Sequence, residues 1–296
     1  MISAANHIEL RHFQYFRVLA EELHYRKASE KLHITQSALS QQIKQLENLL
    51  GVFLLDRINK KVVLTDAGHV FYADSVRVLN KIDSAINNLE LFKEGKEGQI
   101  KIAFVASAMD SILPELFSRF HDEHPDVRLY LSEMTNKEQL ETIRSGGADI
   151  GFVRTNQVGH DMIFKSVLKE TLTLILPADH HLNKDNFTDV GQVKDERYIL
   201  LPNDYSPSYF QQILSLCADQ NFQPRISHIS THVPTIFKLV ENKMGLSIIP
   251  TSSATGNNPN IRFIELDNIP QRTELFAVWN KHSGNPALPY LLKLLH

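Results

Sequence analysis

Cysteine is nearly absent from this sequence, since Cys217 is the only one among 296 residues. A single thiol cannot form an intramolecular disulfide, which argues against an extracellular disulfide framework and against a switch built on two thiols. We expect Cys217 to be a buried residue without a role of its own. Also missing are an apolar run near the roughly 20 residues of a membrane span and a signal-peptide layout at the N-terminus. These absences predict a cytoplasmic protein.

Signatures of common enzymes are missing as well. The sequence contains no GxSxG, no GxxxxGK[ST] and no HExxH. His180 and His181 are adjacent on a predicted loop, where neighbouring side chains diverge, so a metal pair there is disfavoured. His228 and His232 are four residues apart, but they straddle a strand end and a helix start, so the helical ligand spacing does not apply. We expect no metal, no cofactor and no catalytic residue, and an enzyme is the remote alternative.

Positive charge is concentrated in one segment of a chain whose formal net charge is -3. Between Arg26 and Lys61 there are seven Lys or Arg residues against three Asp or Glu, a local charge of +4 in 36 residues. A locally cationic module on an acidic molecule is typical of a surface that meets nucleic acid.

A helix beginning after Thr35 is the best candidate to contact DNA. Apolar residues at spacings of four, three and four predict one buried stripe, made of Leu39, Ile43, Leu46 and Leu50. Thr35 can cap the helix. The other face carries short or amide-tipped side chains and one cation, a mix that suits base edges and phosphates in a major groove. The residues expected to contact DNA from this region are Lys31, Thr35, Gln36, Ser37, Ser40, Gln41 and Lys44. The alternative is an ordinary solvated polar face.

The flanking sequence completes a DNA-binding unit. Phe13, Phe16, Ala20 and Leu23 predict an amphipathic helix, and Ala28 with Leu32 predicts a short second one. After the third helix, a basic hairpin is expected, with a turn at Ile58-Asn59 and cations that can contact phosphates or enter the minor groove: Arg57, Lys60 and Lys61. Residues 1–65 are thus predicted to form a winged helix-turn-helix. A solvated basic loop is the alternative for the hairpin.

A long helix is predicted over residues 66–93, which have no proline and only Gly68 as glycine. Apolar residues recur there at heptad spacing, with only Ser75 polar in the series: Phe71, Val78, Ile82, Ala85, Leu89 and Phe92. Such a seam favours a helix that pairs with a copy of itself, because a lone helix of this length would expose it. We predict a dimerising linker at 66–95. Packing against the chain's own second domain is the alternative.

Strand and helix patterns alternate through residues 96–296. Strands are expected at 100–104, 127–131, 149–153, 171–177, 246–250 and 274–279, and helices at 113–124, 137–145, 208–218, 233–242 and 286–295. This alternation predicts a parallel α/β domain. Because the last strand and helix can return to the first unit, two lobes are expected, lobe I at about 98–170 and 275–296 and lobe II at about 171–274, with a cleft between them.

Three predicted loops suit a small anion in that cleft. Each places hydroxyl or amide side chains where a strand ends or a helix begins: Ser107 with Ala108, Thr135 with Asn136, and Thr231 with His232. Free amides at helix N-termini and the helix dipole favour a carboxylate. An organic acid is the natural ligand. Each of these residues could instead be a plain helix cap.

From Leu10 onward the chain resembles the LysR-type transcriptional regulators. The motifs that carry the resemblance are ELRHFQYF, KASEKLHITQSALSQQIKQLE, LGVFLLDR and LTDAG. The chain departs from the family pattern at three positions. Arg26 stands where the family usually has Ser or Thr, Gln41 stands where many members have Arg, and Leu55 replaces the usual Phe. Gln pairs best with adenine where Arg favours guanine, so the base preference that goes with Arg is not carried over to Gln41. The resemblance implies a periplasmic-binding-protein-like effector domain, a homodimer or homotetramer, and contact with promoter DNA and RNA polymerase.

The effector region, FVASAMDSILPELF, SEMTNKEQLETIRSGGADIGFVR and GLSIIP, is similar to the branch that responds to aromatic acids and their ring-cleavage products. In that branch, the residues matching Ser107 and Asn136 bind the effector carboxylate. Arg154 matches an Arg that some relatives use for a second acidic ligand, although His232 replaces its usual acidic partner. The loop with Asn203 and Tyr205 is expected to overhang the cleft. The function implied is control of a catabolic operon, as activator or repressor, by an aromatic or dicarboxylic acid. The alternative is a ligand-independent repressor or architectural regulator.

Overall fold

Three helices and a two-stranded hairpin begin the chain: α1 (Leu10–Glu22), α2 (Tyr25–Lys31), α3 (Gln36–Leu50), β1 (Leu55–Ile58) and β2 (Lys61–Leu64). The computed structural model describes residues 7–58, 61–93, 98–203, 205–254 and 258–295. Leu39, Ile43 and Leu46 of α3 are fully or almost fully buried against α1, as the periodicity predicted. The winged helix-turn-helix prediction is confirmed.

Side-chain caps begin the second and third helices. The hydroxyl of Thr35 accepts a hydrogen bond from the amide of Ala38 at 3.2 Å, which satisfies one of the free donors at the start of α3. The ring of His24 caps α2 by accepting from the amide of Lys27. His24 therefore supplies the cap of α2, while Arg26 lies within the first turn and donates to Glu30.

The hairpin prediction was wrong by about one residue. Ile58 is the last residue of β1 and pairs with Lys61, so it belongs to the strand and not to the turn. Asn59 and Lys60 lie outside the described residues.

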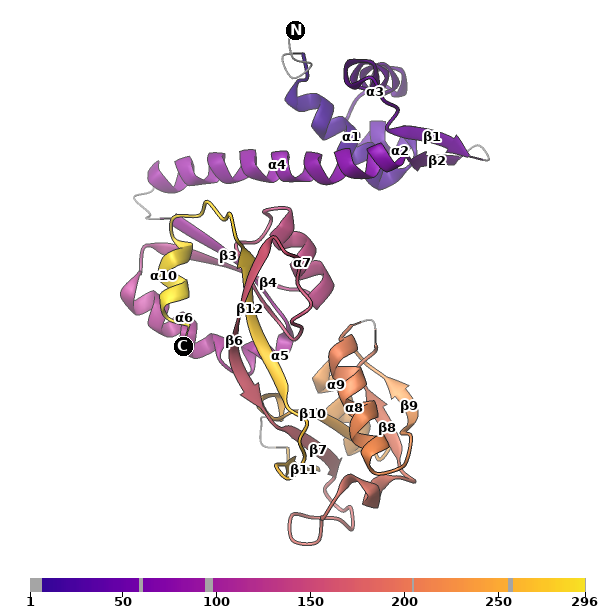
Figure 1. The fold of residues 1–296 in the computed structure, drawn as a ribbon, viewed down its shortest axis with the longest axis vertical. Coiled ribbons are helices and arrows are strands. Elements are labelled where there is room, and N and C mark those ends of the chain that lie inside the picture. Colours follow the sequence, from indigo (N-terminus) through magenta and orange to yellow (C-terminus); the bar gives the residue numbers. More distant parts are fainter. Residues whose placement is uncertain (1–6, 59–60, 94–97, 204, 255–257, 296) are drawn as a thin grey trace. The chain divides into compact units, whose positions relative to one another are not determined.

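The predicted long helix forms as α4 (Asp66–Lys93), 28 residues without a break (Figure 1). Its first turns pack on α1. Phe71 lies 5.3 Å from Phe13 and 5.2 Å from Phe16, measured between ring centroids, and belongs to the core of the winged unit. Phe71 was wrongly assigned to the intermolecular seam, because α1 covers this part of the helix within the same chain. Ser75 is buried, and its hydroxyl donates to the carbonyl of Phe71.

A five-stranded sheet forms the first lobe of the effector region, in the order β4-β3-β5-β12-β6. Its strands are β3 (Gly98–Phe104), β4 (Val127–Glu133), β5 (Ile150–Val153), β6 (Met162–Glu170) and β12 (Thr273–Asn280). β4 and β5 flank β3 in parallel register, and β12 returns antiparallel between β5 and β6. The parallel prediction is right for three strands and wrong for the returning ones.

Helices cover both faces of this sheet: α5 (Ala106–Met109), α6 (Leu113–Glu123), α7 (Asn136–Arg144) and α10 (Leu288–Lys293). Ile100 and Ile102 face a core shared with α6 and α10, whereas Ala103 faces a second core that includes Ile143 of α7. Alternate residues of β3 thus pack on opposite faces, as the strand geometry requires.

The second lobe has two small sheets. β7 (Leu172–Pro177) lies between β10 (Ser247–Pro250) and β11 (Ile261–Leu266), with both pairings antiparallel, and β8 (Arg197–Leu200) pairs in parallel with β9 (Arg225–Ile229). α8 (Pro207–Asp219) and α9 (Val233–Glu241) complete it, with the short 3-10 turns η2 (Val190–Val193) and η3 (Thr251–Ser253). A wholly parallel sheet was therefore the wrong expectation here. The chain crosses between the lobes after Glu170 and again after Leu266.

Three strands were missed by the sequence analysis, β6, β8 and β11, and β9 was indicated only by the strand end expected at His228. The sequence of β6 has no apolar alternation, and its residues from Ile163 to Ser166 are all exposed. Residues 1–95 and 144–147 form one compact unit, and the remaining residues form another.

Among the described helices, none combines the length and apolar content that a bilayer crossing requires.

Candidate functional site

The residues predicted to contact DNA share the exposed face of α3. Gln36, Ser37, Ser40, Gln41 and Lys44 are all exposed, whereas the apolar stripe faces the core. Thr35 is exposed too, and its hydroxyl lies 3.1 Å from that of Ser37. The structure therefore brings together a continuous polar surface on one helix.

The predicted cations differ in their surroundings. The ammonium of Lys31 is paired with Glu22, and this hydrogen bond raises the pKa of Lys31. Lys61 at the start of β2 is exposed. Lys60 and the side chain of Arg57 lie outside what the structure describes. Of the three cations predicted for the wing, Lys61 is therefore the one whose side chain the structure describes.

Most of the predicted seam on α4 is exposed. Val78 is 37% exposed and Leu89 is 65% exposed, Ala85 is exposed and Ile82 is partly buried. These residues recur at spacings of four, three and four, which places them on one side of the helix. Ile86, 52% exposed and missed in the sequence analysis, lies beside them. The side chain of Phe92 is outside the described set.

Ser107, predicted to bind the effector carboxylate, contacts a buried cation. The Nε of Arg154 donates to the Oγ of Ser107 at 2.7 Å. Ser107 lies in α5, directly after β3, and Arg154 follows β5, so neighbouring parallel strands deliver both residues to the same edge of the sheet. A serine hydroxyl can accept one hydrogen bond and still donate its own hydrogen. The pair can therefore present two donors to one carboxylate.

Arg154 is 7% exposed and is held on several sides. Its Nη2 lies 2.7 Å from Oε1 of Glu170, and its Nη1 donates to Thr273 at 3.1 Å. Burial lowers the pKa of Arg154, and the carboxylate of Glu170 opposes that shift. Ser252 also donates to Glu170 through its amide and hydroxyl, at 2.6 and 3.0 Å. These contacts connect β5 of the first lobe through Glu170 to Ser252 of the second lobe.

Glu170 was missed in the sequence analysis. It stands at the end of an unrecognised strand, 16 residues from Arg154, in a run of mixed charged and apolar residues with no distinguishing motif. The expectation that Arg154 had lost its acidic partner with the change at His232 was therefore incomplete. Glu170 supplies the carboxylate.

Asn136 and Thr135 have different surroundings. Asn136 is buried, and its Oδ1 accepts the amide of Arg154 at 2.9 Å, so it fixes the backbone that carries the guanidinium. Thr135 forms a reciprocal cap with Glu138, whose Oε2 accepts from both the amide and the hydroxyl of Thr135 at 2.8 Å. These hydrogen bonds lower the pKa of Glu138. For Thr135 the plain-cap alternative describes the observed geometry.

The remaining predicted effector residues are more dispersed. Ala108 is fully buried in the first lobe's core. Tyr205 is half-buried, and burial, together with the carboxylates of Glu133 and Glu138, raises its pKa. Asn203, Thr231 and His232 are exposed. His232 begins α9, and its amide donates to Ser230.

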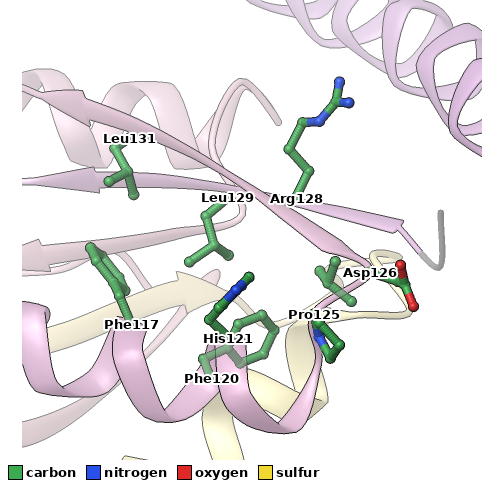
Figure 2. Close-up of a pocket in the computed structure, with 9 residues that line it drawn as sticks. Phe117, Phe120, His121, Pro125, Asp126, Arg128, Leu129 and Leu131 are labelled. Atoms are coloured by element: carbon green, nitrogen blue, oxygen red, sulfur yellow. The ribbon is translucent and has the colours of Figure 1, made fainter.

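Hollows in the effector region differ in how close they lie to the candidate site. One of about 190 Å³ is lined by Arg154, Tyr209, Gln212, Arg272 and Thr273, among others, and joins residues of both lobes. Another of about 400 Å³ lies between α6 and β4, where Phe117 and His121 face Leu129 and Leu131 (Figure 2). None of the predicted effector residues lines this second hollow. The first, which contains Arg154, is the one adjacent to the candidate site.

Cys217 is fully buried, as expected. Burial raises the pKa of its thiol to about 12, and the hydroxyl of Tyr198 opposes the rise. Against an ordinary pKa near 8.5, this leaves roughly a thousandfold less thiolate at pH 8. We expect a disulfide reagent to label the folded protein at pH 8 very slowly and the urea-unfolded protein at once. Equal labelling rates in the two states would contradict the burial of Cys217.

The two histidine pairs considered in the sequence analysis have different surroundings. His180 lies 3.2 Å from Glu196 through Nε2 and accepts the amide of Leu182 through Nδ1, so protein groups engage both of its ring nitrogens. His228 is in β9 and His232 begins α9, as the sequence indicated.

Comparisons with known proteins agree with this architecture. The family model for the bacterial regulatory helix-turn-helix protein of the lysR family matches residues 10–69, and the model for the LysR substrate binding domain matches residues 93–296. The chain belongs to the LysR family of bacterial transcriptional regulators. It is therefore a DNA-binding regulator with an effector-binding domain, in a family of regulators and not of enzymes.

Individual members of the LysR family align over nearly the whole chain. The Hca operon transcriptional activator HcaR of Escherichia coli K12 is 32% identical, with 95% of both chains covered. The transcriptional regulator CatR of Pseudomonas putida is 34% identical, with 88% of both covered. The crystal structure of full-length CbnR complexed with its target DNA shares the fold, with a TM-score of 0.74 at 24% identity over 97% of this chain and 99% of that one.

Proposed function

We propose that this LysR-family protein controls a catabolic operon in response to an organic acid, aromatic or dicarboxylic, that binds beside Ser107 and Arg154. The observation that carries the proposal is the 2.7 Å contact between the Oγ of Ser107 and the Nε of Arg154. A hydroxyl and a guanidinium at one point form a receptor for a carboxylate. The relative HcaR, named as the transcriptional activator of the Hca operon, supports a role in operon control.

An entering acid would compete for groups that are already engaged. Arg154 is held by Glu170, so the ligand's carboxylate would take the hydroxyl of Ser107 and share the guanidinium. Because Glu170 also accepts two hydrogen bonds from Ser252 of the second lobe, a shift of Arg154 alters a link between the lobes. A ligand that binds one arrangement of the lobes better than another shifts their equilibrium by that difference in affinity. This is the step that would couple the acid to DNA.

On the DNA side, residues 1–65 would read the promoter, 66–95 would dimerise and 96–296 would sense the effector. The exposed face of α3 would lie in the major groove, and the wing, with Arg57, Lys60 and Lys61, would lie along the flanking backbone. Val78, Ile82, Ala85 and Leu89 would pair α4 with that of a second copy. A homodimer, or a tetramer of two dimers, would then present α3 helices to a pseudo-palindromic site, in the cytoplasm and in reach of RNA polymerase.

The effector part of the proposal is tested by a thermal-shift screen against benzoate, salicylate, cinnamate and muconate. A ligand at about 100 times its Kd should stabilise the folded protein by roughly 2.7 kcal/mol, a shift of a few degrees. We expect one of these acids to raise the Tm of the wild type and to leave Ser107→Ala unchanged. Ser111→Ala, which removes a hydroxyl bonded only to the carbonyls of Ser107 and Ala108 in the described structure, is the control and should keep the shift.

If no acid raises the Tm, the organic-acid assignment falls. The better interpretation is then a ligand-independent regulator. The conclusion that the protein binds DNA is unaffected, because it rests on the N-terminal unit.

A further inference from the structure

The connection between α3 and the wing is short and poorly packed. Gly51 ends α3 in the left-handed region, at φ 72°. Val52 and Phe53, the next two residues, are 48% and 77% exposed, and only Leu54 is buried. Side-chain packing therefore fixes this segment at one residue. Other contacts must determine the angle at which the hairpin leaves the recognition helix.

Glu47 supplies such contacts. Its Oε1 accepts the amides of Leu54 at 2.8 Å and Leu55 at 3.1 Å, seven and eight residues further along the chain. Leu55 is the first residue of β1, so one carboxylate oxygen on α3 holds the base of the wing. Hydrogen bonds to a carboxylate are roughly twice as strong as those between neutral groups.

The position of Glu47 is otherwise unfavourable. It lies in the last turn of α3, where the helix dipole is negative and where the structure has no basic side chain. An acidic residue there costs stability, and it also adds negative charge to a unit that meets DNA. The two amides at the base of the wing offset this cost.

A second tie links the same segment to α4. The hydroxyl of Thr65 donates to the carbonyl of Phe53 at 2.8 Å, and the amide of Thr65 donates to the carbonyl of Leu54 at 3.1 Å. The Thr65 hydroxyl also accepts the amide of Gly68, in the first turn of α4. A Cβ on Gly68 would lie 2.0 Å from the carbonyl oxygen of Leu54, so only glycine permits this approach. The three elements α3, wing and α4 therefore meet at residues 53–55.

We propose that Glu47 is a positioning residue that fixes the orientation of the wing relative to the recognition helix α3, so that α3 and the wing contact DNA as one rigid unit. The inference rests on the proposed DNA contacts of α3 and the wing. The carboxylate of Glu47 is oriented toward the amides of Leu54 and Leu55, so its proposed role requires no contact of its own with DNA. Its loss would free the hairpin while leaving the core of α3, at Leu39, Ile43 and Leu46, unchanged.

The test compares Glu47→Ala and Glu47→Gln with Glu30→Ala in the full-length protein, on a DNA fragment that the wild type selects from a random pool. Glu30 is an exposed glutamate paired only with Arg26 in the described structure. Removing either acid removes one negative charge, which by electrostatics alone tightens DNA binding. We expect Glu30→Ala to bind as well as the wild type or better, and Glu47→Ala to bind at least about fivefold more weakly, because wing contacts are lost.

Two further measurements distinguish a misplaced wing from a general loss of folding. The slope of log K against log salt should fall by about 0.9 for each lost phosphate contact, and hydroxyl-radical protection should disappear in the flanking minor groove while major-groove contacts remain. Glu47→Gln, which keeps an acceptor oxygen, should lie between wild type and Glu47→Ala; if Glu47→Ala does not fold, Glu47→Gln carries the test. An unchanged slope and footprint in a folded Glu47 variant would overturn the proposal. Failure of the wild type to select any DNA would instead overturn the proposed function.

Discussion

Replacing Arg154 with methionine is expected to destabilise the effector domain by about 3–5 kcal/mol, since it leaves the carboxylate of Glu170 buried without its cation. The side chains of Arg154 and Glu170 are 6% and 9% exposed, so water cannot replace the lost partner. For a domain of this size the loss corresponds to roughly 10 °C in Tm, measurable by calorimetry.

A double variant tests the reason for that loss. Arg154→Met combined with Glu170→Leu removes both charges and should recover most of the stability, because a buried pair replaced by apolar residues is often neutral or better. The control is Lys238→Met, which removes a solvent-exposed lysine from its surface pair with Glu241 and should cost less than about 1 kcal/mol. If Arg154→Met and Lys238→Met lower the free energy of unfolding by the same amount, the buried Arg154–Glu170 pair contributes no more to stability than a surface pair.

Ala85→Glu is expected to convert the protein to a monomer and to weaken promoter binding by roughly a hundredfold or more, because linked binding to a second half-site is lost. Ala85 is exposed in the centre of the seam with Val78, Ile82 and Leu89. Each copy of the variant would bring a carboxylate into that apolar surface, where desolvation is costly.

Ala73→Glu is the matched control for this change. Ala73 is an exposed alanine on the same helix but outside the heptad series, so helix propensity and added charge are the same. Sedimentation should show Ala73→Glu in the wild-type assembly and Ala85→Glu at the monomer mass. If Ala85→Glu keeps the wild-type assembly and DNA affinity, α4 is not the dimer interface.

The sequence predicted those elements whose formation depends on residues close together in the chain. The spacing of Leu39, Ile43 and Leu46 determines which face of α3 is buried, and Thr35 stands where a cap is needed, so both followed from periodicity and side-chain chemistry. Phe71 shows the limit of the same reasoning. A heptad series marks an apolar face, but it does not say whether a second copy or the chain's own α1 covers it.

The missed part of the site depends on tertiary structure. Glu170 reaches Arg154 only because β6 lies at the far edge of a sheet whose order is set by the returning strand β12. Glu47 lies on the predicted recognition helix, yet its role depends on a turn that brings Leu54 and Leu55 back to its carboxylate. Motif comparison gave Ser107, whereas its contact with Arg154 required coordinates.

The most direct test of the central claim is the bend and affinity of promoter DNA with and without an acid that raises the Tm. Energy transfer between dyes at the two ends of a selected fragment reports both. We predict that the acid changes the bend angle or the Kd with the same midpoint as its thermal shift, and that Ser107→Ala removes the change while still binding DNA. An acid that stabilises the protein through Ser107 but leaves bend and affinity unchanged would contradict the account, because ligand binding and DNA binding would then be uncoupled.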